Sequence, residues 1–180
     1  MTRPVAFGLN VDPNTGGLAI AARIAAIEGI TGPRRTVAEA RQALSEAVDI
    51  IRASWTGEPF QYAGQHYQVP DAQPGPRPAH DVGIWLGVVG PRAVRLAGAK
   101  ADGWSVSAPY VPPPRLAELG DILTESAREA GRDPDRIVRL YHVMGLITPE
   151  SQDTFHGPKE RWVDTLTALY SDFGMRAAGS

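Results

Sequence analysis

The sequence contains no cysteine among its 180 residues. A disulfide framework, a thiolate metal site and a cysteine nucleophile are therefore all excluded. An excess of charge of one sign is also missing, because 18 Lys and Arg residues stand against 20 Asp and Glu and the net charge is only −2. This balance gives no general attraction to nucleic acid or to an anionic membrane, so we expect neither as a partner.

Long apolar runs are absent as well. No uninterrupted stretch would cross a bilayer, and no basic segment followed by an apolar one opens the chain, so we expect a cytoplasmic protein. The four histidines show no metal-ligand spacing, and we expect no metal site. A hydrophobic content of 43% and a charged content of 21% are typical of a globular protein. We expect a single domain over residues 1–180.

The most informative segment runs from Val82 to Ser107. An apolar run over 82–89 is followed by Gly90, by Pro91 and by a helical pattern, which predicts a strand, a tight turn and a helix. Gly90 suits the turn, and Pro91 suits the first helical position. The N–H groups at such a turn and the positive end of the helix dipole favour an anion. We therefore expect a phosphate site at Val89, Gly90, Pro91 and Arg92, with Arg95 adding charge. The alternative is a turn that only reverses the chain.

Residues 101–107 predict the next strand, so the segment is one strand-helix-strand step of a parallel sheet. Three motifs occur in order: Ile84-Trp-Leu-Gly-Val-Val-Gly-Pro-Arg-Ala-Val-Arg-Leu-Ala-Gly98, Ala101-Asp-Gly-Trp104 and Gly131-Arg-Asp-Pro134. In these motifs the sequence resembles the luciferase-like monooxygenase superfamily of flavin- or deazaflavin-dependent oxidoreductases, over most of residues 32–174. The resemblance implies that the turn at Gly90 contacts the phosphate of the cofactor, which would be FMN or coenzyme F420.

The fold implied by the resemblance is a (β/α)8 barrel, which usually needs about 250 residues. A chain of 180 residues is too short for it. We therefore expect an α/β fold that is an incomplete TIM-type barrel, with about four parallel strands and four to five helices. A run like Gly32 to Thr36 lies past the fourth strand in relatives but follows the first predicted helix here. An internal deletion explains this spacing, and the alternative is that Val5 to Val11 is itself the fourth strand.

The start of the chain predicts a strand over 4–11 and a helix over about 18–28. Asp12 follows that strand, and in a barrel the carboxyl end of a strand faces the active site. We therefore include Asp12 among the candidate cofactor-binding residues. The alternative is that Asp12 is a turn or cap residue, which its type favours.

The segment 36–81 predicts a helix and a hairpin. Thr36 and Glu39 form a capping box, and an apolar face follows it at helical spacing: Val37, Ala40, Leu44, Ala47, Val48, Ile51 and Trp55. We expect the acids of this helix, Glu46 among them, on a solvated face. Alternating aromatic residues within 57–81 predict a small hairpin, and the prolines after it predict an extended linker.

The last third predicts a helix that ends at Gly131, a long strand over 137–147 and a final helix that ends at Gly174. We expect Tyr141 and His142 to pack in the core, although either could line a site if it points inward. The segment from Met175 to Ser180 is expected to be too short for a strand.

The resemblance implies hydride transfer or oxygen activation on a reduced flavin, with a small organic substrate. No residue matches the Asp-His pair that many relatives carry after the second strand, so we expect the activity to be weak or lost. The competing hypothesis is a non-catalytic barrel remnant or a self-associating assembly module. A sheet that lacks units has open edges, so we expect a homo-oligomer with Val5 to Val11 or Ile137 to Ile147 at an edge.

Overall fold

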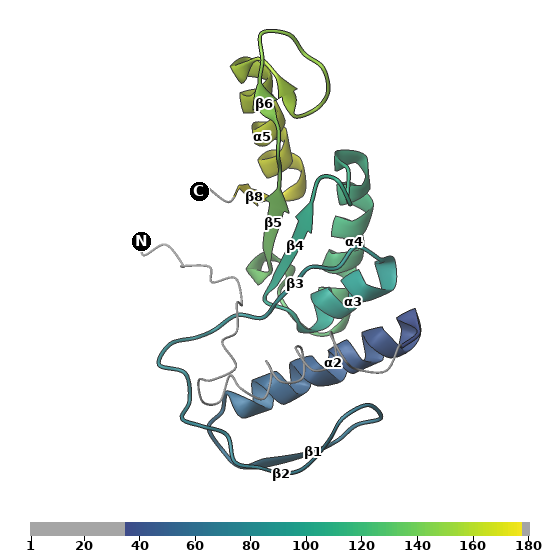
Figure 1. The fold of residues 1–180 in the computed structure, drawn as a ribbon, viewed down its shortest axis with the longest axis vertical. Coiled ribbons are helices and arrows are strands. Elements are labelled where there is room, and N and C mark those ends of the chain that lie inside the picture. The colour runs from purple at the N-terminus through teal and green to yellow at the C-terminus, as the bar shows by residue number, and fades with distance from the viewer. Residues whose placement is uncertain (1–34, 178–180) are drawn as a thin grey trace. The chain divides into compact units, whose positions relative to one another are not determined.

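The computed structural model describes residues 35–177 (Figure 1). The predicted strand at 4–11, the predicted helix at 18–28 and Asp12 lie outside the described residues. The chain divides into two compact units, 1–82 and 83–180. None of the helices in 35–177 is both long enough and apolar enough to cross a membrane.

In the first unit, helix α2 (Val37–Ser54) begins where the sequence predicts it. The Thr36 hydroxyl accepts a hydrogen bond from the Glu39 N–H, and the Glu39 carboxylate accepts one from the Thr36 N–H at 2.7 Å. The predicted capping box is therefore confirmed. Strands β1 (Phe60–Ala63) and β2 (Gln68–Ala72) pair antiparallel as the predicted hairpin. Pro70 is tolerated in β2 because each strand of a two-stranded hairpin is an edge strand.

The prediction for Glu46 was wrong. This side chain is only 8% exposed, and its carboxylate accepts hydrogen bonds at 2.9–3.0 Å from three backbone N–H groups, those of Gln65, His66 and Tyr67. Burial raises the pKa of Glu46, but the three donors together lower it, and the net pKa lies below its usual value. Glu46 thus ties the hairpin turn to α2. At the start of the same helix Val37, expected in the core, is 86% exposed.

The second unit is built on four parallel strands in the order β3 (Trp85–Leu86), β4 (Gly103–Ser107), β5 (Val138–His142) and β8 (Arg176–Ala177). Helix α3 (Pro91–Lys100) connects β3 to β4. Helix α4 (Pro113–Glu129) and a 3-10 turn, η1 (Pro134–Arg136), connect β4 to β5. A small parallel pair, β6 (Leu146–Ile147) and β7 (His156–Gly157), and helix α5 (Lys159–Phe173) precede β8. The described residues therefore form an α/β fold with parallel strands and four α-helices.

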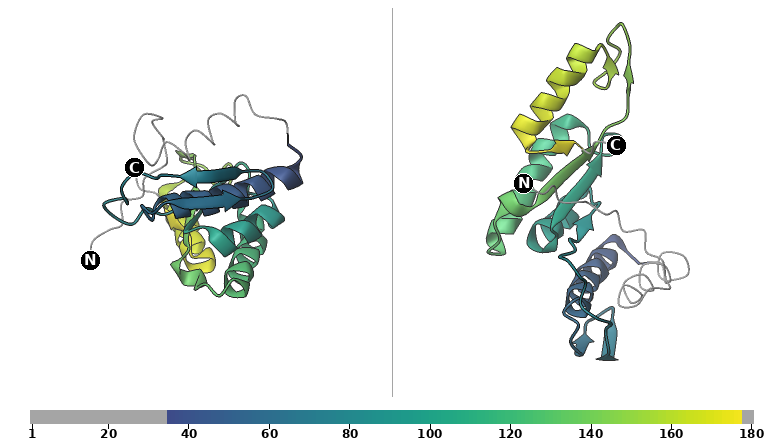
Figure 2. Two further views of the ribbon diagram at one scale, coloured as in Figure 1. Left: turned by 90° about the horizontal axis from the view of Figure 1, so that it is seen from below. Right: turned by 90° about the vertical axis from the view of Figure 1, so that its left-hand side faces the viewer.

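Helices α3 and α4 lie side by side on one face of this sheet (Figures 1 and 2). They bury the apolar side chains of that face, which include Leu86, Trp104 and Val106. A side chain at Gly98 would collide with the Ser126 hydroxyl and the Leu123 carbonyl, so glycine permits the close contact between the two helices. The glycines predicted to end α4 and α5 are confirmed, and both are left-handed, with φ of 69° at Gly131 and 60° at Gly174.

Three predictions about strands were wrong. The apolar run over 82–89 contains only two strand residues, and the predicted strand over 137–147 is interrupted after His142. Pairing of β5 with β4 ends at His142. Farther on, the backbone of Phe155 packs directly against Gly145 and its carbonyl accepts a hydrogen bond from the Leu146 N–H, and residues 146–147 pair with β7 instead of extending β5. The segment after Met175 does supply a strand, β8. Strand β5 therefore lies between β4 and β8 and is not an edge, and the outer strands of the described sheet are β3 and β8.

Candidate functional site

The turn between β3 and α3 carries the predicted phosphate site. Gly90 is the N-cap of α3 with no side-chain capping bond, and Pro91 is its first residue. The Gly90 carbonyl accepts hydrogen bonds from the N–H groups of Ala93 and Val94, each at 2.9 Å. Among residues 35–177, no partner is found for the N–H groups of Val89, Gly90 or Arg92. These donors, together with the helix dipole, make the turn able to bind an anion.

Space for an anion is present beside these donors. A Cβ atom built on Gly90 would meet nothing within 4 Å. Gly90 has φ −90° and ψ 141°, a conformation open to any residue, so the backbone of the turn does not depend on glycine. Glycine leaves the space next to the N–H groups empty, and a larger side chain would fill that space without straining the backbone.

The motif Ala101-Asp-Gly-Trp104 fixes this turn from the neighbouring strand. The Asp102 carboxylate accepts a hydrogen bond from the Ile84 N–H at 2.8 Å. The indole N–H of Trp104, which is fully buried, donates to the Val88 carbonyl at 2.9 Å. Gly103 lies against the ring of Trp85, with which any side chain at position 103 would collide. Asp102, Gly103 and Trp104 thus position β3 and the segment between β3 and Gly90.

The positive charge near the turn comes from a different pair of arginines than the sequence predicts. Arg92 is exposed and has no ion-pair partner among the described residues. Arg95, expected to add charge there, instead pairs with Glu125 at 3.2 Å and with Glu129 at 3.5 Å. Arg115, in the first turn of α4, donates to the Val89 carbonyl at 3.3 Å. Sequence analysis missed Arg115 because no local pattern indicates that the start of α4 meets this turn.

The sheet face opposite α3 and α4 carries two polar side chains in contact, those of Ser105 and His142. The strand register places six side chains of β3, β4 and β5 on this face, all of them at least partly exposed: Trp85, Ser105, Ser107, Val138, Leu140 and His142. The Ser105 hydroxyl and Nε2 of His142 lie 2.9 Å apart. His142 is the last residue of β5 and is exposed, so the expectation of a core imidazole was wrong.

The expectation that Tyr141 packs in the core is confirmed. Its side chain is 4% exposed, and its hydroxyl donates to the Val111 carbonyl at 2.6 Å. Burial raises the pKa of Tyr141 to about 12. Tyr141 therefore stays neutral and joins β5 to the loop before α4, and it has no role in the exposed group on the other face.

A second imidazole belongs to His156, the first residue of β7. Nδ1 of His156 lies 2.9 Å from an Asp153 carboxylate oxygen. That hydrogen bond, and a second one from the Phe155 N–H, lower the pKa of Asp153. No group of three or more His, Asp or Glu side chains in 35–177 is arranged to hold a metal ion.

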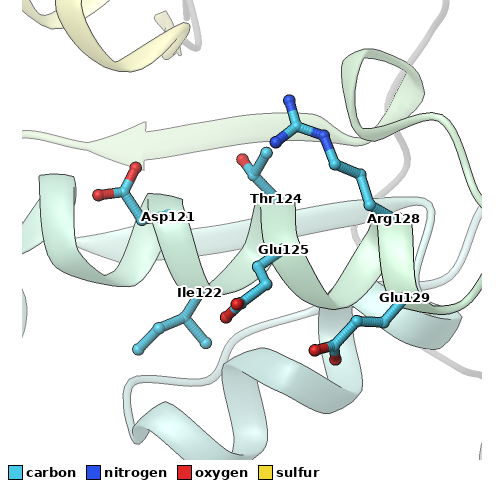
Figure 3. A pocket seen from close by; sticks show the side chains of 6 residues that line it. All are labelled: Asp121, Ile122, Thr124, Glu125, Arg128 and Glu129. Carbon is cyan, nitrogen blue, oxygen red and sulfur yellow. The ribbon is translucent and has the colours of Figure 1, made fainter.

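A surface hollow of about 520 Å³ lies over α4 (Figure 3). All of its lining residues belong to that helix: Asp121, Ile122, Thr124, Glu125, Arg128 and Glu129. It includes no residue of the Gly90 turn or of the face that carries His142. Two of its acids, Glu125 and Glu129, already pair with Arg95, so the hollow is a charged surface of the helix layer.

Comparison with known proteins adds to this geometry. The protein-family model for luciferase-like monooxygenases matches residues 20–154. An F420-dependent glucose-6-phosphate dehydrogenase of Microbacterium testaceum (strain StLB037) is 37% identical over 109 residues, which are 61% of this chain and 32% of that protein. An F420-dependent hydroxymycolic acid dehydrogenase of Mycobacterium tuberculosis (strain ATCC 25618 / H37Rv) is 29% identical over 109 residues, 61% of this chain and 29% of that protein. The chain thus spans about a third of the length of these relatives.

Solved structures share the fold. An F420-dependent secondary alcohol dehydrogenase in complex with an F420-acetone adduct superimposes with a TM-score of 0.63 at 20% identity, over 88% of this chain and 52% of that one. A long-chain alkane monooxygenase superimposes with a TM-score of 0.65 at 12% identity, over 86% of this chain and 55% of that one.

Proposed function

The chain belongs to the luciferase-like monooxygenase family, and from this membership we propose that it is an oxidoreductase that holds the phosphate of coenzyme F420 or FMN on the Val89–Arg92 turn. F420 is the preferred cofactor, because two relatives that align with 61% of the chain are named for their dependence on it. The substrates in the names of both relatives carry hydroxyl groups. We therefore propose an alcohol as the substrate class.

The observation that carries the proposal is the set of unpartnered N–H groups beside open space at the start of α3. A hydrogen bond from an N–H group to a charged acceptor is worth about 1.5–3 kcal/mol. Two such bonds to a phosphate would therefore contribute about 3–6 kcal/mol. Pro91 supplies no N–H, and the guanidinium groups of Arg92 and Arg115 offset that loss.

The site residues and the cofactor have separate tasks in this proposal. The bound cofactor supplies the hydride transfer chemistry. The turn at Gly90 fixes its phosphate at the carboxyl ends of the parallel strands, which is the edge where sheets of this kind hold their ligands. The face that carries Ser105 and His142 extends from the same edge and is available to the substrate. Asp12, outside the described residues, remains a candidate for the cofactor site.

Catalysis by this chain alone should be slow. We infer an incomplete barrel, because the described sheet has four parallel strands where a (β/α)8 barrel has eight. A barrel enzyme gathers its functional groups from the ends of several strands. Loss of positioned acid-base groups typically lowers the rate by about 10²–10⁴-fold.

The second candidate function is a non-catalytic, self-associating module. The outer strands of the described sheet are β3 and β8, and each contains only two residues. One edge of each pairs with no described strand, and a strand of another chain could pair there. This candidate predicts a molar mass of at least twice 19.3 kDa by light scattering, together with no uptake of cofactor. A mass near 19.3 kDa at all concentrations would exclude it.

The test is a titration of the protein with F420 and, separately, with FMN, followed by the fluorescence of the cofactor. Three proteins are compared: the wild type, Gly90→Val and Gly87→Ala. A Gly90→Val side chain fills the space beside the N–H groups. Gly87→Ala is the matched control, because its Cβ atom would make only an ordinary contact, 3.5 Å from the Ser105 carbonyl.

We expect Gly90→Val to weaken cofactor binding by roughly 100-fold, which corresponds to the loss of about 3 kcal/mol of hydrogen bonding to the phosphate. Gly87→Ala should bind like the wild type. Equal affinity of the wild type and Gly90→Val would refute the phosphate assignment. A colourless protein that takes up neither cofactor would refute the enzyme proposal and favour the self-associating module.

A further inference from the structure

The contact between Ser105 and His142 joins two polar side chains on adjacent strands. Ser105 lies in β4 and His142 ends β5, and their Oγ and Nε2 atoms lie 2.9 Å apart. This distance is that of a normal hydrogen bond. No other side-chain hydrogen bond or ion pair is found for His142 among residues 35–177. The serine hydroxyl is therefore the one described group that orients this imidazole.

The surroundings of the pair differ from those of a structural histidine. His142 is exposed, and it is the one imidazole among the described side chains of its face, which it shares with Trp85, Ser105, Ser107, Val138 and Leu140. In the described sheet only β4 separates β3, which leads to the Gly90 turn, from β5, which ends at His142. Neighbouring strands are about 4.8 Å apart, so β3 and β5 lie about 10 Å apart across the sheet.

We propose that Ser105 and His142 accept the hydroxyl proton of an alcohol substrate, an inference that rests on the proposed function. The substrate hydroxyl donates a hydrogen bond to Oγ of Ser105, and the Ser105 hydroxyl donates to Nε2 of His142. A serine oxygen can donate one hydrogen bond and accept others, and a neutral imidazole nitrogen without hydrogen is an acceptor. The arrangement requires the His142 tautomer that carries its hydrogen on Nδ1.

The step balances in atoms and electrons. The substrate O–H bond breaks as an O–H bond forms at Ser105, and the original Ser105 O–H bond breaks as an N–H bond forms at Nε2 of His142. A bound oxidised deazaflavin would supply the two-electron acceptor for the carbinol hydrogen, so that breaking the C–H bond would turn the alcohol into a carbonyl compound. His142 would then carry the positive charge of the proton that it accepted.

The test uses the full chain with F420 bound and compares His142→Gln, Ser105→Ala and Ser107→Ala. Ser107 is the matched control, because its hydroxyl belongs to the same strand and face but makes no described hydrogen bond with His142. Reduction of F420 by 2-propanol and by glucose 6-phosphate is followed by absorbance in single-turnover experiments. The affinity for F420 is measured separately for each variant, and imidazole is added to His142→Ala as a rescue.

We expect His142→Gln to lower the rate by about 10²-fold or more, Ser105→Ala to lower it at least 10-fold, and Ser107→Ala to leave it unchanged. The affinity for F420 should stay within 2-fold in all variants, and imidazole should restore part of the rate of His142→Ala. Unchanged rates in His142→Gln, or no F420 reduction by wild-type protein that has bound the cofactor, would overturn this proposal alone. Absence of cofactor binding would overturn the proposed function and this inference with it.

A readout without turnover is provided by ¹⁵N NMR of the His142 imidazole in the cofactor-free protein. In the wild type we expect the neutral tautomer with hydrogen on Nδ1, because Nε2 accepts from Ser105. In Ser105→Ala the tautomers should return to the mixture of a free imidazole, and in Ser107→Ala the wild-type pattern should persist. Hydrogen on Nε2 of neutral His142 in the wild type would overturn the proposal.

Discussion

Replacement of Trp104 by phenylalanine tests how strongly the fold holds the candidate site. Trp104 is fully buried, and its indole N–H donates to the Val88 carbonyl at 2.9 Å. Phenylalanine keeps an aromatic ring in the core but leaves that carbonyl without this donor, at a cost of about 1–2 kcal/mol. The atoms removed from the core add about 1–2 kcal/mol for lost packing. We therefore expect Trp104→Phe to lower the free energy of unfolding by about 2–4 kcal/mol.

The assay is equilibrium unfolding in urea, followed by far-ultraviolet circular dichroism, with Trp85→Phe as the control. Trp85 lies on the adjacent strand, is partly exposed and has no described partner for its indole N–H. That variant should lose less than about 1.5 kcal/mol. Because the hydrogen bond holds the segment before Gly90, Trp104→Phe should also weaken F420 binding. Equal losses of stability in the two variants would refute the role assigned to this hydrogen bond.

Three further predictions concern stability. The pKa of Glu46 is lowered in the folded protein. The Glu46 carboxylate therefore adds to the free energy of unfolding above its ordinary pKa, and this stabilisation is lost as the pH falls through the lowered pKa of the folded state. Urea unfolding from pH 6 to pH 3 should show this loss in the wild type and not in Glu46→Gln. Gly98→Val should prevent the close contact of α3 with α4 at Ser126 and should yield protein without a cooperative thermal transition. Arg132 donates at 2.7 Å to the carbonyls of Gly98 and Ala101 at the end of α3, so Arg132→Ala should lower the free energy of unfolding by about 1–3 kcal/mol, whereas Arg136→Ala, at an exposed position, should have little effect.

Features encoded by local sequence were predictable. The capping box at Thr36, the proline at the start of α3 and the glycines that end α4 and α5 each depend on a few neighbouring residues, and all are confirmed. The strand-helix-strand step around Gly90 was predictable for the same reason, because its apolar periodicity and its turn residues agree.

Features that depend on distant parts of the chain were not predictable. Glu46 looks like a surface acid in its helix, and only the hairpin turn, 19 to 21 residues later, makes it a buried acceptor. Arg115 reaches the Gly90 turn from 26 residues away, and Ser105 meets His142 across 37 residues. Residues 146–147 pair with β7 instead of extending β5, and no periodicity indicates that pairing.

The central claim is that the cofactor phosphate binds to the backbone N–H groups at the start of α3. The most direct measurement is a ¹H–¹⁵N NMR titration of the wild-type protein with F420. The account predicts that the largest amide shifts occur at Val89, Gly90 and Arg92 and that Gly90→Val abolishes them. Saturable binding in which the largest amide shifts occur elsewhere, for example near Arg35, would contradict the claim if the Gly90 amide does not shift.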